Sequence, residues 1–209
     1  MARHTLVRKC EHCLKADKKS NHCTVFTEPG WMWRKGKCWG YKPRLIVYLG
    51  GSIHGHSTLK EAMTWRLYAA GVLEAAGYEV LNPLHQPRPA TVEAIIKRDL
   101  QDINRADILL VEMDHKDKPY IGTSMEIRYA WERKKEIILF GRANRESIWL
   151  QYHASAWYED LGQALAYLKE RGIKLYGDLE RVKRSPGGMA EGAAGTRDGR
   201  ARVCGGGGI

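Results

Sequence analysis

Short apolar runs alternate with longer amphipathic stretches between residues 44 and 140. The runs are rich in Val, Ile and Leu, which is typical of strands buried on both faces of a parallel sheet. They cover residues 44–50, 79–84, 108–113 and 137–140. Because helix-like stretches separate them, the order strand, helix, strand, helix predicts an α/β fold with a doubly wound, mainly parallel sheet of the flavodoxin or Rossmann kind.

The stretches between the runs carry apolar residues at helical spacing. Residues 58–76 are predicted to form a helix that Gly77 ends. Residues 91–105 predict a second helix, and its inward side is expected to carry Val92, Ile95, Ile96, Leu100 and Ile103. A third helix is expected to begin at Gly122–Thr123 and a last one to cover about 160–171. Between these two, residues 149–157 are expected to form a loop or a short fifth strand.

Charge divides the chain into three parts. Of the 34 Lys and Arg and the 24 Asp and Glu, residues 44–178 hold eighteen of each and carry no net charge. Residues 1–43 hold ten basic and three acidic residues, and residues 179–209 hold six and three. A fold that binds nucleic acid over its whole surface is therefore not supported, whereas a basic N-terminal module is. The prediction is a module at 1–43, a sheet domain at 44–178 and a disordered glycine-rich tail at 179–209.

Neither a membrane span nor a secretion signal is visible in the sequence. No run of about 18 apolar residues occurs. The N-terminal stretch MARHTLVRKCEHC also lacks the apolar segment of a signal peptide. A cytoplasmic protein is expected.

Four cysteines in the N-terminal module follow the spacing C-x2-C-x9-C-x14-C: Cys10, Cys13, Cys23 and Cys38. One CxxC knuckle followed by two single cysteines can form a tetrahedral structural zinc site, as in zinc ribbons, in a segment too short for a core of its own. His12 and His22 adjoin cysteines and are alternative ligands. Free thiols and disulfides are the other two interpretations, and nothing indicates the secretion that would favour disulfides.

The same module holds aromatic residues among its lysines and arginines: Trp31, Trp33, Trp39 and Tyr41. Aromatic and basic side chains together can stack on the bases of a single nucleic-acid strand and bind its phosphates. The alternative, which we favour, is that these rings pack the small module against the sheet domain.

A glycine-rich turn, GGSIHGH, follows the first predicted strand and precedes a helix. Free backbone N–H groups and the positive end of a helix both favour a phosphate or another anion at such a turn. The turn matches neither the Walker pattern nor GxGxxG, so a bound nucleoside triphosphate or dinucleotide is not expected.

Two carboxylates are predicted to converge at one edge of the sheet. Asp99 lies on the helix before the third strand, and Glu126 lies in the first turn of the helix after it. Open α/β sheets bind ligands at the carboxyl ends of their strands. Two carboxylates there can divide the roles of nucleophile and general acid, as in glycoside-cleaving enzymes. A response to the helix dipole is the alternative for Glu126, and three other acidic residues compete with Asp99: Asp102, Asp107 and Asp114.

Three ordered motifs between Arg44 and about Leu168 resemble the nucleoside 2-deoxyribosyltransferase family. They are VYLGGSIHGH from Val47, RDLQDINRADILLVEMD from Arg98 and GTSMEIRYAWERKKEIILF from Gly122. The likeness is greatest to the branch of deoxynucleoside 5′-monophosphate N-glycosidases. The module and the tail lie outside the resemblance.

The resemblance implies roles for the matching residues. Glu126 would be the nucleophile that attacks C1′ of the sugar, Asp99 would hold and protonate the leaving base or orient the sugar, and Tyr48 would position the nucleophile. The loop that receives a 5′-phosphate in the monophosphate branch would consist of Gly51, Ser52, Ile53, His54 and Gly55. Gly122 and Thr123 would bind substrate, although capping of their own helix by Thr123 or Ser124 is an equal alternative.

The chain also departs from the family's pattern. Where the transferases usually carry an acidic residue before the glycine that precedes the nucleophile, this chain has Tyr120 and Ile121, with Asp117 further back. This favours the hydrolase-like branch. A neighbouring subunit of the family contributes a polar residue to the site, and the candidates here are Ser147, Gln151 and His153.

The expected function is cleavage or exchange of the N-glycosidic bond of a (deoxy)nucleoside or its 5′-monophosphate through a covalent glycosyl–glutamate intermediate. No cofactor is needed for this chemistry, any zinc would be structural, and a homo-oligomer is implied by the resemblance. Two alternatives are hydrolysis of another N-riboside such as NAD, and a nucleotide-sensing module whose basic arm binds nucleic acid.

Overall fold

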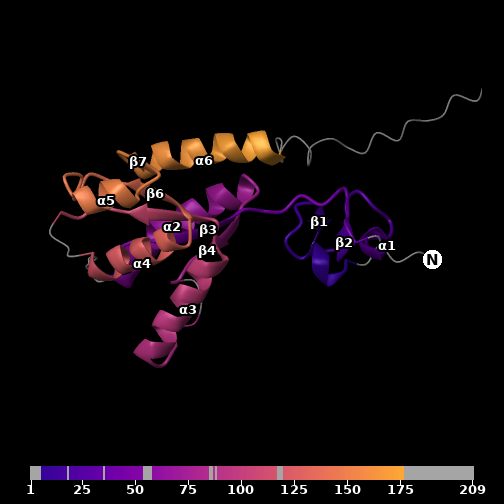
Figure 1. Ribbon diagram of the computed structural model, residues 1–209, viewed down its shortest axis with the longest axis horizontal. Coiled ribbons are helices and arrows are strands. Elements are labelled where there is room, and N and C mark those ends of the chain that lie inside the picture. Colours follow the sequence, from indigo (N-terminus) through magenta and orange to yellow (C-terminus); the bar gives the residue numbers. More distant parts are fainter. Residues whose placement is uncertain are drawn as a thin grey trace, which may run out of the picture.

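The computed structural model describes residues 6–17, 19–34, 36–53, 58–84, 87, 89–116 and 120–176. The predicted tail at 179–209 lies outside these residues, as do His54, Gly55 and Asp117. Figure 1 shows a sheet domain and a smaller N-terminal module beside it. Within the described residues, none of the helices has the length and apolar character that crossing a membrane requires.

A five-stranded parallel sheet forms the centre of the larger domain, in the order β4-β3-β5-β6-β7. Its strands are β3 (Ile46–Gly50), β4 (Glu79–Leu81), β5 (Ile108–Glu112), β6 (Glu136–Phe140) and β7 (Ala156–Tyr158). The predicted doubly wound fold is thereby confirmed, and the fifth strand is present. From β3 the chain adds β4 on one side and then returns to add β5, β6 and β7 on the other side. Parallel sheets of this kind bind ligands at the carboxyl ends of the two strands where the order switches, here β3 and β5.

Helices cover both faces of the sheet (Figure 1). On one face, α2 (Leu59–Ala75) and α6 (Leu161–Tyr176) pack on the alternate strand residues that include Val47, Leu49 and Leu110. On the other face, α3 (Val92–Arg105), α4 (Ile121–Glu132) and α5 (Ile148–His153) cover Tyr48, Leu109 and Val111. Such alternation is what a strand buried on both faces requires. Thr58 and Thr91 begin α2 and α3 as N-caps, each accepting a hydrogen bond from a backbone N–H three residues on.

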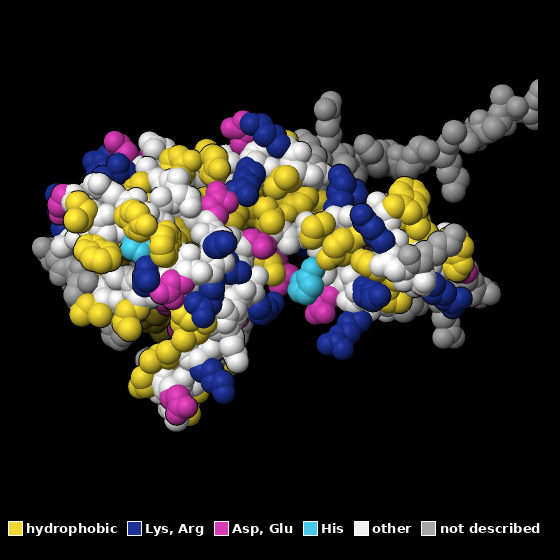
Figure 2. Space-filling model, in the orientation of Figure 1, with side chains coloured by type: hydrophobic (Ala, Val, Ile, Leu, Met, Phe, Trp, Pro, Cys, Tyr) yellow, Lys and Arg dark blue, Asp and Glu magenta, His cyan; other side chains and the backbone are white. Residues whose placement is uncertain are grey.

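Two expectations about helices were wrong. The inward side predicted for α3 is buried only at its carboxyl end, because Ile103 is fully buried whereas Val92 and Ile96 are 72% and 54% exposed. The first turns of α3 project beyond the body of the domain, where hydrophobic side chains remain visible on the surface (Figures 1 and 2). Residues 148–153 form α5 rather than loop or strand, because Ser147 caps a helix that buries Leu150 and His153.

The N-terminal module consists of η1 (Arg8–Cys10), β1 (Ala16–Asp17), β2 (His22–Cys23) and α1 (Pro29–Arg34), and β1 pairs with β2 in an antiparallel manner. It contacts the amino-terminal edge of the sheet, where His12 Nδ1 lies 3.0 Å from Oε2 of Glu79 at the start of β4. Its small core contains Cys10, Cys13 and Ala16. Trp33 packs on that core and donates its indole N–H to Cys10 Sγ at 3.3 Å.

The prediction that the module's aromatic residues pack against the sheet domain does not hold for Trp31 and Trp39, whose side chains are 48% and 74% exposed. Trp33 and Tyr41 instead pack on each other inside the module, with ring centroids 5.3 Å apart.

Candidate active site

Tyr48 and Glu126 meet beside the carboxyl end of β3. Tyr48 is buried on β3 and donates its hydroxyl to Glu126 Oε1 at 3.1 Å. Glu126 is the sixth residue of α4, which begins at Ile121 and has no acidic residue in its first turn. The prediction of a first-turn position was therefore wrong, and the helix dipole does not explain the carboxylate, since that effect is confined to the first turn.

Asp99 is the second carboxylate of this site. It lies on α3, its side chain is 15% exposed, and Arg98 Nη2 donates to its Oδ1 at 3.0 Å. The same Arg98 nitrogen donates to the carbonyl of Pro83 at 2.9 Å, so the carboxylate is anchored to the chain that follows β4. The negative charge of Asp99 raises the pKa of both Tyr48 and Glu126, which shows that the three groups share one electrostatic environment.

The three competing aspartates have other contacts, although the charge of Asp102 also raises the pKa of Asp99. Asp102 pairs with Arg105 at 3.5 Å. Asp107 stands at the amino end of β5 and accepts the backbone N–H of Ile46 at 2.9 Å, so its role is to join two strands. Asp114 follows β5 and donates its backbone N–H to Glu112, while no contact links its carboxylate to the site within the described residues. Of the four, Asp99 is the one whose charge acts on Glu126.

Burial sets the electrostatics of the pair. Desolvation is the main cause that raises the pKa of Glu126 to about 7; the charge of Asp99 acts in the same direction, while the Tyr48 hydrogen bond and Arg66 oppose it. Desolvation also raises the pKa of Asp99, although Arg98 opposes the shift. The pKa of Tyr48 lies well above its usual range because the hydroxyl is buried beside these carboxylates. A carboxyl group that titrates near neutral pH is typical of acid–base and nucleophilic sites.

Arg66 on α2 binds the backbone at the start of the glycine turn, a role that no pattern in the sequence indicates. Its guanidinium is fully buried and donates to three backbone carbonyls, those of Leu49 at 3.3 Å, Gly51 at 2.9 Å and Ala62 at 2.7 Å. These bonds tie the end of β3 and the start of the turn to α2. Its positive charge also lowers the pKa of Glu126.

Two glycines allow the turn to approach the carboxylates. A Cβ atom at Gly50 would lie 3.5 Å from Glu126 Oε2 and 3.3 Å from Val111, so the backbone itself forms one wall beside the Glu126 carboxylate. Gly51 has φ +140° and a Cβ there would lie 2.9 Å from Glu112 Cβ. A larger residue is therefore disfavoured at Gly51, whereas at Gly50 it would fill the space beside Glu126.

Glu112 at the end of β5 was also missed. Its buried side chain accepts hydrogen bonds through Oε1 from the hydroxyl of Tyr120, at 2.7 Å, and from the backbone N–H of Asp114. Within the described residues, its other oxygen has no hydrogen-bond partner. Tyr120 stands in the left-handed region with φ +43° immediately before α4. Since Glu112 holds this tyrosine, it fixes the entry into the helix that carries Glu126.

The other predicted substrate-binding residues lie around this centre. Ser52 is buried and Ile53 is partly exposed, directly after Gly51. Gly122 is exposed and Thr123 is buried in the first turn of α4, whose N-cap is Tyr120, so neither Thr123 nor Ser124 caps the helix. Because His54 and Gly55 are outside the described residues, the predicted phosphate loop is described only as far as Ile53.

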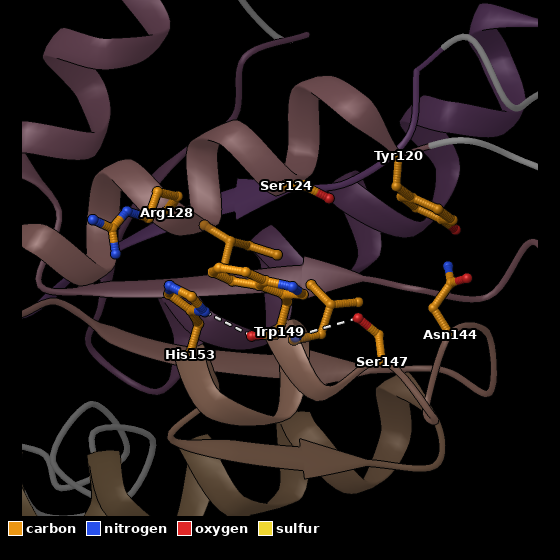
Figure 3. Close-up of a pocket in the computed structure, with 9 residues that line it drawn as sticks. Tyr120, Ser124, Arg128, Asn144, Ser147, Trp149 and His153 are labelled. Atoms are coloured by element: carbon orange, nitrogen blue, oxygen red, sulfur yellow. Dashed lines mark hydrogen bonds between the residues drawn. The ribbon is translucent and has the colours of Figure 1, made fainter.

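The three candidates for a residue donated to a neighbouring subunit all lie on or beside α5. Ser147 caps this helix, Gln151 donates to the carbonyl of Arg145, and His153 Nδ1 contacts the carbonyl of Trp149 at 2.6 Å. Ser147 and His153 line a cavity of about 520 Å³ between α4 and α5, whose lining also includes Tyr120 and Trp149. Figure 3 shows Ser124 and Arg128 on the α4 side of this cavity, facing the α5 residues. Gln151 does not line it.

The four predicted zinc ligands do not form a ligand set in the part of the chain that the structure describes. Cys10 and Cys13 share the core of the module, while Cys23 Sγ accepts the backbone N–H of Phe26 at 3.4 Å. No group of three or more His, Cys, Asp or Glu side chains suited to a metal ion occurs among these described residues. All four thiols are free, so the disulfide interpretation is not realised. Zinc stays a prediction that metal analysis of the purified chain tests.

The chain is similar to known proteins both in sequence family and in structure. Residues 47–190 match the family described as nucleoside 2-deoxyribosyltransferase. A 2-desoxiribosyltransferase from Leishmania mexicana is 17% identical, with a TM-score of 0.49 over 60% of this chain and 97% of its own. A CMP N-glycosidase from Clostridium botulinum is 21% identical, with a TM-score of 0.43 over 61% of this chain and 98% of its own. No curated protein sequence matches the chain.

Proposed function

The chain belongs to the nucleoside 2-deoxyribosyltransferase family, and we propose that Glu126 is its nucleophile, Asp99 its acid/base and Tyr48 the residue that orients Glu126. The protein is accordingly an enzyme that cleaves or exchanges the N-glycosidic bond of a nucleoside or nucleotide. The observation that carries the assignment of roles is the hydrogen bond of 3.1 Å between Tyr48 and a Glu126 whose pKa is raised to about 7.

The proposed reaction consists of two displacements. An ionised Glu126 oxygen attacks C1′ of the sugar and forms an ester bond as the C1′–N bond to the base breaks. The electron pair of that bond stays with the base, which receives a proton from Asp99. Water or a second base then attacks C1′, Asp99 takes up the proton, and the Glu126 carboxylate is released. Two inversions at C1′ give net retention of configuration.

Two features of the site bear on this division of roles, the orientation of the two Glu126 oxygens and the burial of Asp99. Tyr48 donates to one Glu126 oxygen, Oε1, whereas Oε2 faces the open side of Gly50, where a side chain is lacking. One oxygen is thus held in place and the other is directed past a backbone wall. Asp99 keeps its proton more readily than an exposed aspartate because desolvation raises its pKa. This is the property that a general acid requires.

The proposed substrates are a (deoxy)nucleoside and its 5′-monophosphate. The glycine turn after β3 supports a phosphate site, because Arg66 orients the peptide groups next to Gly50 and the helix α2 follows the turn. Backbone N–H groups and a helix N-terminus together favour an anion. Water as the acceptor is favoured over a second base because Tyr120 and Ile121 stand where transferases of the family usually carry an acidic residue.

A homo-oligomer is part of the proposal, with α4 and α5 in the contact. Large apolar side chains stand exposed on this side of the domain, while the helices that bear them pack on the sheet with their other side. They are Ile121, Met125, Ile148, Trp149 and Tyr152. Monomeric proteins rarely expose a contiguous apolar patch of this kind. Trp149→Asp is expected to lower the sedimentation coefficient of the protein, and an unchanged coefficient would argue against this contact.

The test of the catalytic assignment compares Glu126→Ala with Glu132→Ala on the same helix, where Glu132 is half-exposed and pairs with Arg128. Both variants and the wild type are incubated with a panel of deoxynucleosides and 5′-monophosphates, with free bases followed by chromatography and glycosyl adducts by intact mass. Loss of base release on the order of 10³-fold or more is expected for Glu126→Ala alone. Equal base release by all three proteins would remove Glu126 from the mechanism.

A further inference from the structure

The N-terminal module carries an exposed aromatic surface formed by Phe26, Trp31 and Trp39. The rings of Phe26 and Trp39 are in edge-to-face contact, with centroids 4.8 Å apart, and this contact holds a tryptophan that is otherwise mostly exposed. Phe26 and the exposed Trp31 line one cavity of about 320 Å³ together with Met32. Trp39 is thus 74% exposed with its ring held against Phe26, and Trp31 is 48% exposed beside the same phenylalanine.

The module that carries this aromatic surface is rich in exposed positive charge. Exposed basic residues lie throughout the module: Arg8, Lys9, Lys19, Arg34, Lys37 and Lys42. Across residues 6–17, 19–34 and 36–43, none of the lysines or arginines forms an ion pair with a carboxylate, although Lys9 lies over the ring of Trp33. One of the three acidic residues, Asp17, is already engaged by Ser20 and by the backbone N–H of Lys19. Figure 2 shows basic and hydrophobic side chains interspersed over the module.

The aromatic surface lies away from the proposed active site. The module contacts the amino end of the sheet through His12 and Glu79, whereas Tyr48, Asp99 and Glu126 lie toward the carboxyl ends of the strands. The family match begins at residue 47, after the module ends. A ligand bound to the module is therefore distinct from the substrate that Glu126 is proposed to attack at C1′. The chemistry of this ligand follows from the side chains of the module alone.

We propose that the N-terminal module binds single-stranded nucleic acid through Trp31 and Trp39. Unpaired bases offer flat faces that stack on exposed indoles, and the phosphates of the strand complement the unpaired Lys and Arg side chains. In a duplex the base faces are stacked on one another, so a duplex would contact only the Lys and Arg side chains of the module. A membrane surface requires a longer amphipathic helix than α1, which has six residues.

The experiment measures anisotropy of labelled twelve-residue oligothymidylate and oligouridylate with the full chain, across a range of salt concentrations. Trp39→Ala is expected to weaken binding about tenfold, within the range reported for loss of one stacked base. Tyr68→Ala serves as the matched control, because this exposed tyrosine lies on α2 of the sheet domain. The double variant Arg34→Gln/Lys37→Gln is expected to reduce the slope of log K against log salt by about 1.4.

Trp39→Phe keeps an aromatic ring beside Phe26 and is expected to restore most of the affinity, which separates loss of stacking from unfolding of the module. Base release at the wild-type rate by Trp39→Ala shows that the sheet domain is unaffected. Absence of binding by the wild type at low salt would overturn the proposal. So would equal affinity of the wild type and Trp39→Ala, or binding of a duplex as tight as that of the single strand. Loss of oligonucleotide binding in Glu126→Ala would also overturn it, since the strand would then occupy the active site.

Discussion

Two ion pairs of the same length lie at opposite ends of the sheet. Arg98 and Asp99 approach to 3.0 Å near the proposed active site, and His12 and Glu79 approach to 3.0 Å where the N-terminal module meets β4. The first pair is mostly buried, with side chains 18% and 15% exposed, whereas in the second pair Glu79 is 21% and His12 43% exposed. Burial raises the pKa of Asp99 despite its arginine partner, and Asp99 in turn raises the pKa of Glu126.

The difference indicates that burial, rather than contact distance, determines how strongly a charged pair shifts the pKa of neighbouring groups. A charge withdrawn from water acts on its neighbours over several ångströms because little solvent screens it. A charge at the surface is screened, and such pairs contribute between zero and about 1 kcal/mol. Function is therefore expected to respond strongly to changes at the carboxyl end of the sheet and weakly to changes at the amino end.

The largest expected effect separates two aspartates of one helix. Asp99→Asn is expected to lower the rate of base release by roughly 10²- to 10⁴-fold, because it removes the acid that protonates the leaving base. Asp102→Asn changes a buried carboxylate three residues away that pairs with Arg105 and acts on Asp99 only through its charge, so a much smaller loss is expected. Single-turnover release of base measures both. Equal losses in the two variants would mean that Asp99 acts through the helix and not on the substrate.

Arg66→Met is expected to destabilise the fold by about 3 kcal/mol, since three backbone carbonyls lose their donor inside the protein. The rate of base release is expected to fall as well, because the turn at Gly51 loses its support. Arg142→Met is the control, as this arginine is 73% exposed and pairs loosely with Glu159. Urea unfolding measures the difference between the two variants. A loss below about 1 kcal/mol for Arg66→Met would show that water replaces the guanidinium.

The next smaller effect is expected in the pH dependence of kcat/KM, which depends on the contact between Tyr48 and Glu126. Glu126 attacks as a carboxylate and its pKa is raised to about 7, so activity is expected to fall as pH decreases through this value. The hydrogen bond from Tyr48 lowers the pKa of Glu126. Tyr48→Phe removes that bond, and the acidic limb is therefore expected to move to higher pH. A limb that stays in place would show that Tyr48 does not act on the ionised form.

Much of the fold could be predicted because hydrophobic pattern determines it locally. The strand ILLVEM is apolar on both faces and can hardly be placed anywhere except in the centre of a parallel sheet. Once the strands are parallel and in order, Asp99 and Glu126 must approach the same edge, because their helices flank that strand. The convergence of the two carboxylates thus followed from topology, and their roles from the resemblance.

Arg66 could not be predicted because its partners are backbone carbonyls. In the sequence TWRLY it has the character of a surface residue of a helix, and only the folded turn brings the carbonyls of Leu49 and Gly51 to it. The helix α5 was missed for a related reason. Its exposed Ile148 and Trp149 have the composition of a strand, while the helix depends on Ser147 as a cap and on burial of Leu150.

The smallest expected effect concerns Glu79, which receives both His12 of the module, at 3.0 Å, and Arg105 of α3, at 3.1 Å. The side chains of His12 and Arg105 are both more than two-fifths exposed, at 43% and 49%. Glu79→Gln is therefore expected to lower the free energy of unfolding by less than about 1 kcal/mol and to leave base release unchanged.

Salt provides the decisive control for this last variant. At about 1 M NaCl the Debye length is about 3 Å, so the contribution of these exposed pairs is expected to disappear and wild type and Glu79→Gln to unfold alike. Urea titrations at low and high salt measure this. A loss above about 2 kcal/mol that persists in high salt would mean that Glu79 is held as tightly as the buried groups around Asp99, and the contrast between the two ends of the sheet would then fail.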